Sequence, residues 1–140
     1  MQTNTKTIKR ELQQTADGSH TLFIPEMDEH YHSVNGAVQE SRHVFIEAGL
    51  HRLSKKDLTV FEIGFGTGLN AFLTLLDAEN SGCRIHYYAV ELYPLDKQLI
   101  KALNYATVIC REKQEQFAAL HEAAWNETVR ITDHFALHKI

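Results

Sequence analysis

A glycine-rich turn follows a short apolar run near the middle of the chain. The run Leu58–Ile63 is rich in β-branched and aromatic residues, which is typical of a buried strand, and it leads directly into Gly64, Gly66 and Gly68. Glycine tolerates positive φ angles and lets a ligand approach the backbone, while the N–H groups at the start of the next helix face that ligand. The spacing is GxGxG rather than GxGxxG. It therefore favours a compact nucleoside with an amino-acid tail over the pyrophosphate of a dinucleotide.

Two carboxylates flank this turn in positions suited to such a ligand. Glu91 ends the second apolar run, Ile85–Glu91, and lies 27 residues after Gly64. A carboxylate at that strand end accepts hydrogen bonds from both hydroxyls of a ribose. Glu62 precedes the first glycine, where we expect it either to hold N–H groups of the loop or to meet an ammonium group of the ligand. An acidic residue on a buried strand needs such a partner.

The first third of the chain predicts a hairpin, a loop and a helix. Asp17-Gly18 favours a tight turn between two partly alternating stretches within Ile8–Ile24, and the polar stretch Pro25–Gly36 indicates an ordered loop. From Ala37 to about Leu53 apolar residues recur at three- and four-residue spacings, which predicts an amphipathic helix. Its expected apolar face carries Ala37, Val44, Phe45 and Ala48, and its expected cap is Ser33 or Asn35.

The remaining runs alternate between helix and strand. Helices are expected from Leu69 to the end signal Asn80-Ser81-Gly82, near Pro94 with Leu95, Leu99 and Leu103, and around Phe117, Leu120 and Trp125. The tail Val129–Ile140 suits one strand or two short ones. This order predicts a doubly wound α/β sheet, in which a right-handed crossover joins the strands on either side of the glycine turn.

Composition excludes several other classes of protein. The 140 residues suit one domain, and the formal net charge of −4 gives no overall basic field, so any nucleic-acid contact must be local. Cys83 and Cys110 form no CxxC pair, which argues against a zinc knuckle or a disulfide framework and fits a reducing cytoplasm. No stretch reaches the roughly 18 apolar residues of a membrane span. His30, His32 and His43 lack a fixed carboxylate partner, so no metal site is predicted.

Two longer motifs resemble a known family. They are Tyr31–Phe45, which reads YHSVNGAVQESRHVF, and Phe61–Asn70, which reads FEIGFGTGLN. Together they resemble the MnmC/MnmD-type tRNA methyltransferases, which use S-adenosylmethionine to finish the 5-methylaminomethyl-2-thiouridine modification of the wobble uridine. The resemblance runs from the hairpin to the C-terminal end and is far more specific than GxGxG alone. It implies a Rossmann-like S-adenosylmethionine-dependent methyltransferase fold, with tRNA as the partner.

The resemblance also implies a set of cofactor-binding residues. The cofactor would lie over the glycine turn with its ribose on Glu91, and Tyr31, Ser33 and Glu40 would line the cofactor pocket or the substrate side. His32 and His43 stand where the family usually has aromatic residues. The predicted cofactor-binding residues are Tyr31, Ser33, Glu40, Glu62, Gly64, Phe65, Gly66, Thr67, Gly68, Asn70 and Glu91.

The family's domain continues well beyond the part that resembles this sequence. It has an Asp-bearing turn that faces adenine and an Asp-x-Phe-x-Pro-like segment near the transferred methyl group, and neither occurs before Ile140. The sequence is therefore expected to hold the front half of the fold, with about three of roughly seven strands, divided into a hairpin and signature loop at 1–36 and a Rossmann-like part at 37–140. We expect these 140 residues alone to be inactive and marginally folded. The absent half would supply much of the tRNA surface and any catalytic proton acceptor, and a fused oxidase domain is left open.

The reaction that the resemblance implies is in-line transfer of a sulfonium methyl group to an exocyclic amine of the modified uridine. The nitrogen must be unprotonated to attack, and positioning together with exclusion of water would supply the acceleration. Two alternatives stay open. A small-molecule methyltransferase of the same fold is favoured by the acidic balance, and a non-catalytic binding module is favoured by the missing later motifs.

Overall fold

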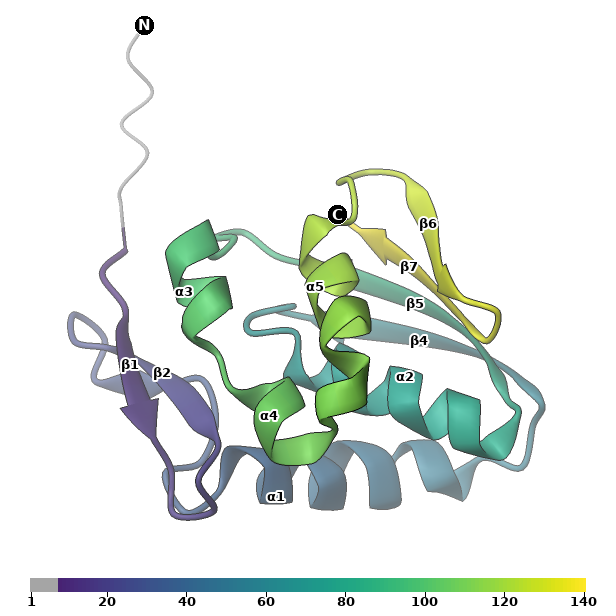
Figure 1. Cartoon of the computed structure of the whole chain (residues 1–140), viewed down its shortest axis with the longest axis horizontal. Coiled ribbons are helices and arrows are strands. Elements are labelled where there is room, and N and C mark those ends of the chain that lie inside the picture. Colours follow the sequence, from purple (N-terminus) through teal and green to yellow (C-terminus); the bar gives the residue numbers. More distant parts are fainter. Residues whose placement is uncertain (1–7) are drawn as a thin grey trace, which may run out of the picture.

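A small antiparallel sheet opens the computed structural model, which describes residues 8–140 (Figure 1). Residues 1–7, part of the segment 1–36 named above, lie outside the described residues. The hairpin predicted around Asp17-Gly18 is present, and a third short strand lies within the stretch expected to be a loop. The strands, in their order in the sheet, are β1 (Glu11–Gln14), β2 (His20–Ile24) and β3 (Glu29–His30).

The helix that follows differs from the predicted one because it contains a π-helical turn. α1 (Ala37–Ser41) passes into the π-helix η1 (Arg42–Glu47), where Ala48 N donates to His43 O at 3.0 Å, and the 3-10 turn η2 (Leu50–Arg52) follows. A π turn takes an extra residue and so shifts the phase of the apolar face. Val44, 60% exposed, and Ala48 therefore face solvent, contrary to the prediction. The buried positions are Ala37, Val38, Ser41, Ile46 and Leu50.

The hairpin turn caps α1, and neither Ser33 nor Asn35 does so. The first backbone N–H groups of a helix have no partner inside the helix and need acceptors from elsewhere. Here the acceptors are side chains 19 to 22 residues away, so the residues next to the helix start do not reveal them. The pairs are Ala37 N to Thr15 Oγ1 (3.1 Å), Val38 N to Ser19 Oγ (3.1 Å) and Gln39 N to Asp17 Oδ2 (3.0 Å).

The larger sheet is mixed and has the strand order β4-β5-β7-β6. β4 (Asp57–Ile63) and β5 (Arg84–Val90) are parallel and are joined by α2 (Leu69–Ser81), as predicted. The tail forms two strands, of which β7 (Phe135–Lys139) is parallel to β5 and β6 (Thr128–Thr132) is antiparallel to β7. The described sheet thus has four strands rather than about three, and β4 forms one edge.

The segment between β5 and β6 is divided more finely than the sequence indicates. It contains α3 (Lys97–Ala102), α4 (Tyr105–Ile109), η3 (Arg111–Lys113) and α5 (Gln114–Glu122). The helix expected near Pro94 is present but shorter than predicted: α3 begins after Asp96, whose carboxylate accepts from Leu99 N at 2.8 Å, and it ends before Leu103, so that Leu95 and Leu103 lie outside it. Trp125 was expected in the last helix, but it lies beyond α5 and forms an isolated parallel β-bridge with Lys139.

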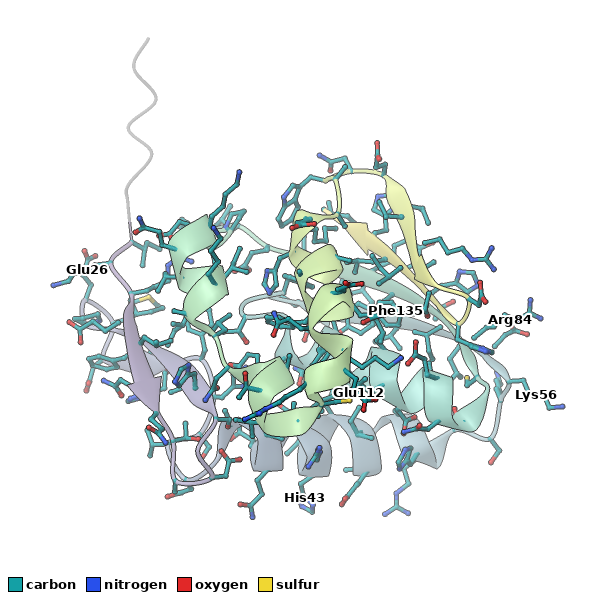
Figure 2. All side chains as sticks on the ribbon, viewed as in Figure 1. Glu26, His43, Lys56, Arg84, Glu112 and Phe135 are labelled. Carbon is teal, nitrogen blue, oxygen red and sulfur yellow. The ribbon has the colours of Figure 1, made fainter. Side chains whose placement is uncertain are left out.

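One face of the larger sheet carries the core. α2 and α5 cover that face (Figure 1), where Tyr87 and Leu137 are fully buried. Figure 2 shows Phe135 in the interior beside α5, whereas Lys56 and Arg84 project from the chain at the amino-terminal ends of β4 and β5. Alternate side chains of β4 point to the other face, and Phe61 and Ile63 are 60% and 85% exposed. Within residues 8–140, none of the helices has the length and apolar character needed to cross a bilayer.

Candidate functional site

The glycine turn lies where the carboxyl ends of β4 and β5 meet. Gly64 N and Phe65 N both donate to Val90 O, at 2.8 and 3.1 Å, so the turn is attached to the end of the neighbouring strand. Gly68 N donates to Phe65 O at 3.0 Å and closes the turn before α2 begins. The φ angles of Gly64, Gly66 and Gly68 are 86°, 56° and 77°, a region that L side chains rarely adopt. The sequence therefore needs glycine at all three positions.

Thr67 anchors the turn to the helices beneath it. Its hydroxyl lies 3.2 Å from the Tyr105 hydroxyl of α4 and 3.3 Å from His32 Nε2. Its carbonyl lies 2.9 Å from His121 Nε2 of α5, so this nitrogen carries the proton and donates. Both helices lie far from the turn in sequence, and no local pattern pointed to Tyr105 or His121.

His121 is kept neutral by its surroundings. Burial lowers its pKa from 6.5 to about 4, and the Lys139 charge acts in the same direction, against the hydrogen bond to Thr67. A Cβ atom on Gly68 would lie 2.9 Å from His121 Nε2, which leaves no room for a side chain there. Gly68 is thus required by the imidazole below it as well as by its φ angle.

Lys139 is a buried cation without a carboxylate partner among the described residues. Its side chain is 1% exposed, and its Nζ donates to His121 O at 2.9 Å. The ammonium group lies 4.7 Å from the centroid of the Trp125 ring and 5.5 Å from that of Phe65. Cation–π contacts of this kind replace part of the lost hydration. Burial still lowers the pKa of Lys139 from 10.5 to about 8.

A cavity of about 420 Å³ opens between the glycine turn, the carboxyl end of β4 and the helix α1–η1. Eight of the predicted site residues line it: Tyr31, Glu40, Glu62, Gly64, Phe65, Gly66, Thr67 and Asn70. Ser33, Gly68 and Glu91 do not. The other lining residues are not among the predicted site residues; they are His32, Ser41, Val44, Phe45, Ile63 and Leu69.

Glu62 and Asn70 form a polar pair in the wall of this cavity. Asn70 Nδ2 donates to Glu62 Oε2 at 2.8 Å, while Glu62 Oε1 and Asn70 Oδ1 are buried and have no hydrogen-bond partner among the described residues. Burial raises the pKa of Glu62 to about 7, a shift that Asn70 and the Tyr87 hydroxyl oppose. The Tyr87 hydroxyl lies close to Glu62, but it forms no hydrogen bond with Glu62 Oε1, and both oxygen atoms are buried without a partner. Two buried acceptors therefore remain available beside the glycine turn.

Glu91 also lies near Gly66 but does not line the cavity. It follows β5 directly, and its N–H donates to Ile140 O at 3.0 Å. Burial raises the pKa of its carboxyl group, and the Arg10 guanidinium and then the N–H groups of Gly66 and Leu92 lower it. The structure thus brings the two strand-end carboxylates, Glu62 and Glu91, to one glycine loop: Glu62 lines the cavity with Gly64 and Gly66, and Glu91 lies near the Gly66 N–H.

The predicted residues of the signature loop have different surroundings. The Tyr31 ring packs on Gly66, since a Cβ atom there would lie 3.2 Å from Tyr31 Cδ2. Glu40 Oε1 accepts from Ser33 N at 3.1 Å and lies 3.9 Å from His32 Nδ1. The Ser33 hydroxyl accepts from Asn35 N at 3.2 Å, within the turn. Burial lowers the pKa of His32, while Glu40 raises it.

Two other observations concern sites elsewhere. Cavities of similar size occur away from the glycine turn, for example one of about 460 Å³ between η1, α2 and η3, where His51 Nε2 lies 2.6 Å from Asp77 Oδ1. Volume alone therefore does not identify the site. Across residues 8–140, no three His, Cys, Asp or Glu side chains gather as metal ligands would. His43 is exposed and points away from the body of the molecule (Figure 2).

Several curated proteins that share one name are similar to the chain in sequence. No protein-family model matches it. The bifunctional protein MnmC of tRNA 5-methylaminomethyl-2-thiouridine biosynthesis is 39% identical over 84 residues in Magnetococcus marinus, covering 55% of this chain and 12% of the relative. The protein of the same name from Campylobacter fetus subsp. fetus is 30% identical over 111 residues, covering 79% of this chain and 18% of the relative. The chain thus spans less than a fifth of the length of these curated relatives.

A solved structure extends the likeness to the fold. The crystal structure of MnmC2 from Aquifex aeolicus superposes with a TM-score of 0.71 at 26% sequence identity. The match covers 98% of this chain and 44% of that chain. The likeness in sequence covers 55% to 79% of the chain and the likeness in fold covers 98% of it, and both are to proteins named MnmC or MnmC2.

Proposed function

We propose that the chain provides the cofactor-binding part of an S-adenosylmethionine-dependent methyltransferase that acts on the aminomethyl group of a modified wobble uridine in tRNA. One observation carries this proposal: a glycine turn between two parallel strands is flanked by the Glu91 carboxylate and by the unpaired acceptors of Glu62 and Asn70. The names of the relatives, which refer to tRNA 5-methylaminomethyl-2-thiouridine biosynthesis, support the choice of substrate.

The residues present fit this cofactor. Its amino-acid end carries an ammonium group with three donors, and Glu62 Oε1 and Asn70 Oδ1 are two buried acceptors without partners. Its ribose carries two hydroxyls, and Glu91 is a carboxylate at the end of the second strand. When bound, S-adenosylmethionine supplies a methyl group on a positively charged sulfur.

The protein's contribution would be positioning and exclusion of water. The bonds from Tyr105 and His121 to Thr67 hold the turn in place before any ligand arrives, so little reorganisation is needed. Phe45 and Leu69 give the cavity apolar walls. Glu62 would bind the ammonium group as a carboxylate, and it would release a proton whenever it starts protonated. None of these residues is assigned as the acceptor of the proton that the attacking amine must lose.

The acidic balance of the chain affects how tRNA would bind. A formal net charge of −4 provides no general attraction for a polyanion, so we place most of the tRNA contact outside these 140 residues. A tRNA substrate and the free thiols of Cys83 and Cys110 fit a cytoplasmic setting.

The cofactor site is tested by calorimetry with S-adenosylhomocysteine on the full-length protein. Gly66→Ala should abolish or strongly weaken binding, because a side chain at φ +56° also meets the Tyr31 ring. Gly82→Ala is the matched control: φ is +74°, nothing lies within 4 Å of its Cβ position, and it ends α2 at the end remote from the turn. Unchanged affinity in a folded Gly66→Ala protein would disprove the site.

The substrate is tested by mass spectrometry of tRNA from a strain that lacks the gene. Loss of 5-methylaminomethyl-2-thiouridine, with accumulation of the unmethylated aminomethyl precursor, is expected. A normal nucleoside profile, in a strain with no second methylase for this position, would refute tRNA as the substrate and favour a small molecule instead. It would not contradict the cofactor site.

A further inference from the structure

Arg10 joins the N-terminal hairpin to the loop that follows β5. Its Nη1 donates to Tyr93 O at 2.8 Å and its Nη2 donates to Pro94 O at 3.3 Å, across 83 and 84 residues of sequence. Nη1 also lies 3.3 Å from the Tyr31 hydroxyl. The Nε–H group is buried and has no partner among the described residues. One guanidinium thus bridges three segments that the sequence keeps apart.

The loop after β5 depends on these bonds. Leu92 and Tyr93 are 79% and 45% exposed, so packing of these two side chains contributes little to holding the loop, whereas Leu95 packs against the core. The strand-like pairing of this segment ends with the bond from Glu91 N to Ile140 O. Beyond it, the carbonyls of Tyr93 and Pro94 are held by Arg10, and a planar guanidinium suits two acceptors at once.

The same guanidinium acts on two neighbours of Gly66. Tyr31, which it contacts, packs on that glycine, and Glu91, whose pKa it lowers against the effect of burial, lies near the N–H of the same glycine. Gly66 lines the cavity of the proposed site, where we expect a ligand to approach the backbone. Arg10 therefore connects the groups that surround this point of approach.

We propose that Arg10 is a positioning residue for the nucleoside end of the site, where it fixes Glu91 and Tyr31 around Gly66 before the ligand binds. This inference rests on the proposed function, in which Glu91 accepts from the ribose hydroxyls. A loop that is already ordered loses less conformational freedom on binding, so its preorganisation adds to affinity. Lysine would keep the charge beside Glu91 but lacks the forked donors that reach both carbonyls.

The test compares Arg10→Gln, Arg10→Lys and the neighbouring control Lys9→Gln in the full-length protein, titrated with S-adenosylhomocysteine. Arg10→Gln should bind about 10-fold more weakly, as expected for loss of hydrogen bonds from a charged donor, and Arg10→Lys should be intermediate. Lys9→Gln should bind as wild type, because the Lys9 side chain is 74% exposed and only approaches Glu11 at 3.8 Å. Carboxyl NMR should show a raised pKa of Glu91 in Arg10→Gln and recovery in Arg10→Lys, which a loss of packing alone would not produce.

The outcomes separate this inference from the proposed function. Wild-type protein that does not bind S-adenosylhomocysteine contradicts the proposed function and removes the basis for the inference. Wild-type binding with Arg10→Gln within twofold of it overturns the inference alone. So does an unchanged pKa of Glu91 in a folded Arg10→Gln protein. If Arg10→Gln does not fold, Arg10→Lys decides, and wild-type affinity in that variant overturns the inference.

Discussion

Acid should destabilise this fold through His121, the imidazole that supports the glycine turn from below. Its pKa is about 4 in the folded chain and 6.5 ordinarily, so between these values the unfolded chain binds a proton that the folded chain does not. Stability therefore falls as the pH falls through this window. At about 1.4 kcal/mol per pH unit the full effect is roughly 3.4 kcal/mol, of which about 2 kcal/mol is reached between pH 8 and pH 5.

His121→Gln isolates this effect, because glutamine keeps a donor for the Thr67 carbonyl but does not titrate. Urea unfolding of wild type and variant at pH 5 and pH 8 can be followed by fluorescence of Trp125, the single tryptophan of the chain. The acid loss should be about 2 kcal/mol smaller in His121→Gln than in wild type. His43→Gln, at a position 78% exposed, is the matched control and should lose as much as wild type. An equal loss in wild type and His121→Gln would refute the role assigned to this imidazole.

Three further predictions follow from the site. Glu91→Ala should weaken S-adenosylmethionine binding by about 10- to 150-fold, because a hydrogen bond to a charged group contributes roughly 1.5–3 kcal/mol, and Glu91→Gln should lie between it and wild type. If calorimetry gives the alanine variant an affinity within twofold of wild type, Glu91 is not part of the site. Binding should weaken about tenfold from pH 8 to pH 6 because Glu62, with a pKa of about 7, must be ionised to hold an ammonium group, and Glu62→Gln should flatten this profile. Lys139→Met should raise the pKa of His121, measured by NMR of the ring, yet leave it below 6.5 because burial is the larger cause; no change would show that the Lys139 charge does not reach the imidazole.

The elements that carry the glycine turn could be predicted because their signals are local. The run Leu58–Ile63, the three glycines and the run ending at Glu91 are each read within a few residues, and β4, the turn and β5 form as expected. Eight of the eleven predicted residues also line one cavity. Whether they bind the cofactor is a prediction that the titrations above test.

The parts that could not be predicted depend on contacts distant in sequence. The π turn places Val44 in solvent although its spacing fits an α-helical apolar face. The support of Thr67 by His121 spans 54 residues, so no periodicity reveals it. Lys139 is fully buried although lysine is ordinarily a surface residue, because its ammonium group lies over the Trp125 ring and donates to a backbone carbonyl. Burial of this kind follows from the tertiary packing and from no local pattern.

The hydrogen bonds from the hairpin turn to the first turn of α1 have a consequence for how the molecule opens. Separating the two segments would leave the three N–H groups of Ala37, Val38 and Gln39 without acceptors, at roughly 1–3 kcal/mol each where water cannot replace them. The two segments should therefore exchange amide hydrogens as one cooperative unit rather than fray separately. Tyr31 and Glu40 of the cavity wall belong to that unit, whereas the glycine turn is attached to the parallel strands. Release of this unit, which must also break the bonds of the hairpin to Asn104 and Tyr105, would open that wall of the cavity while leaving the hydrogen bonds of the parallel sheet in place.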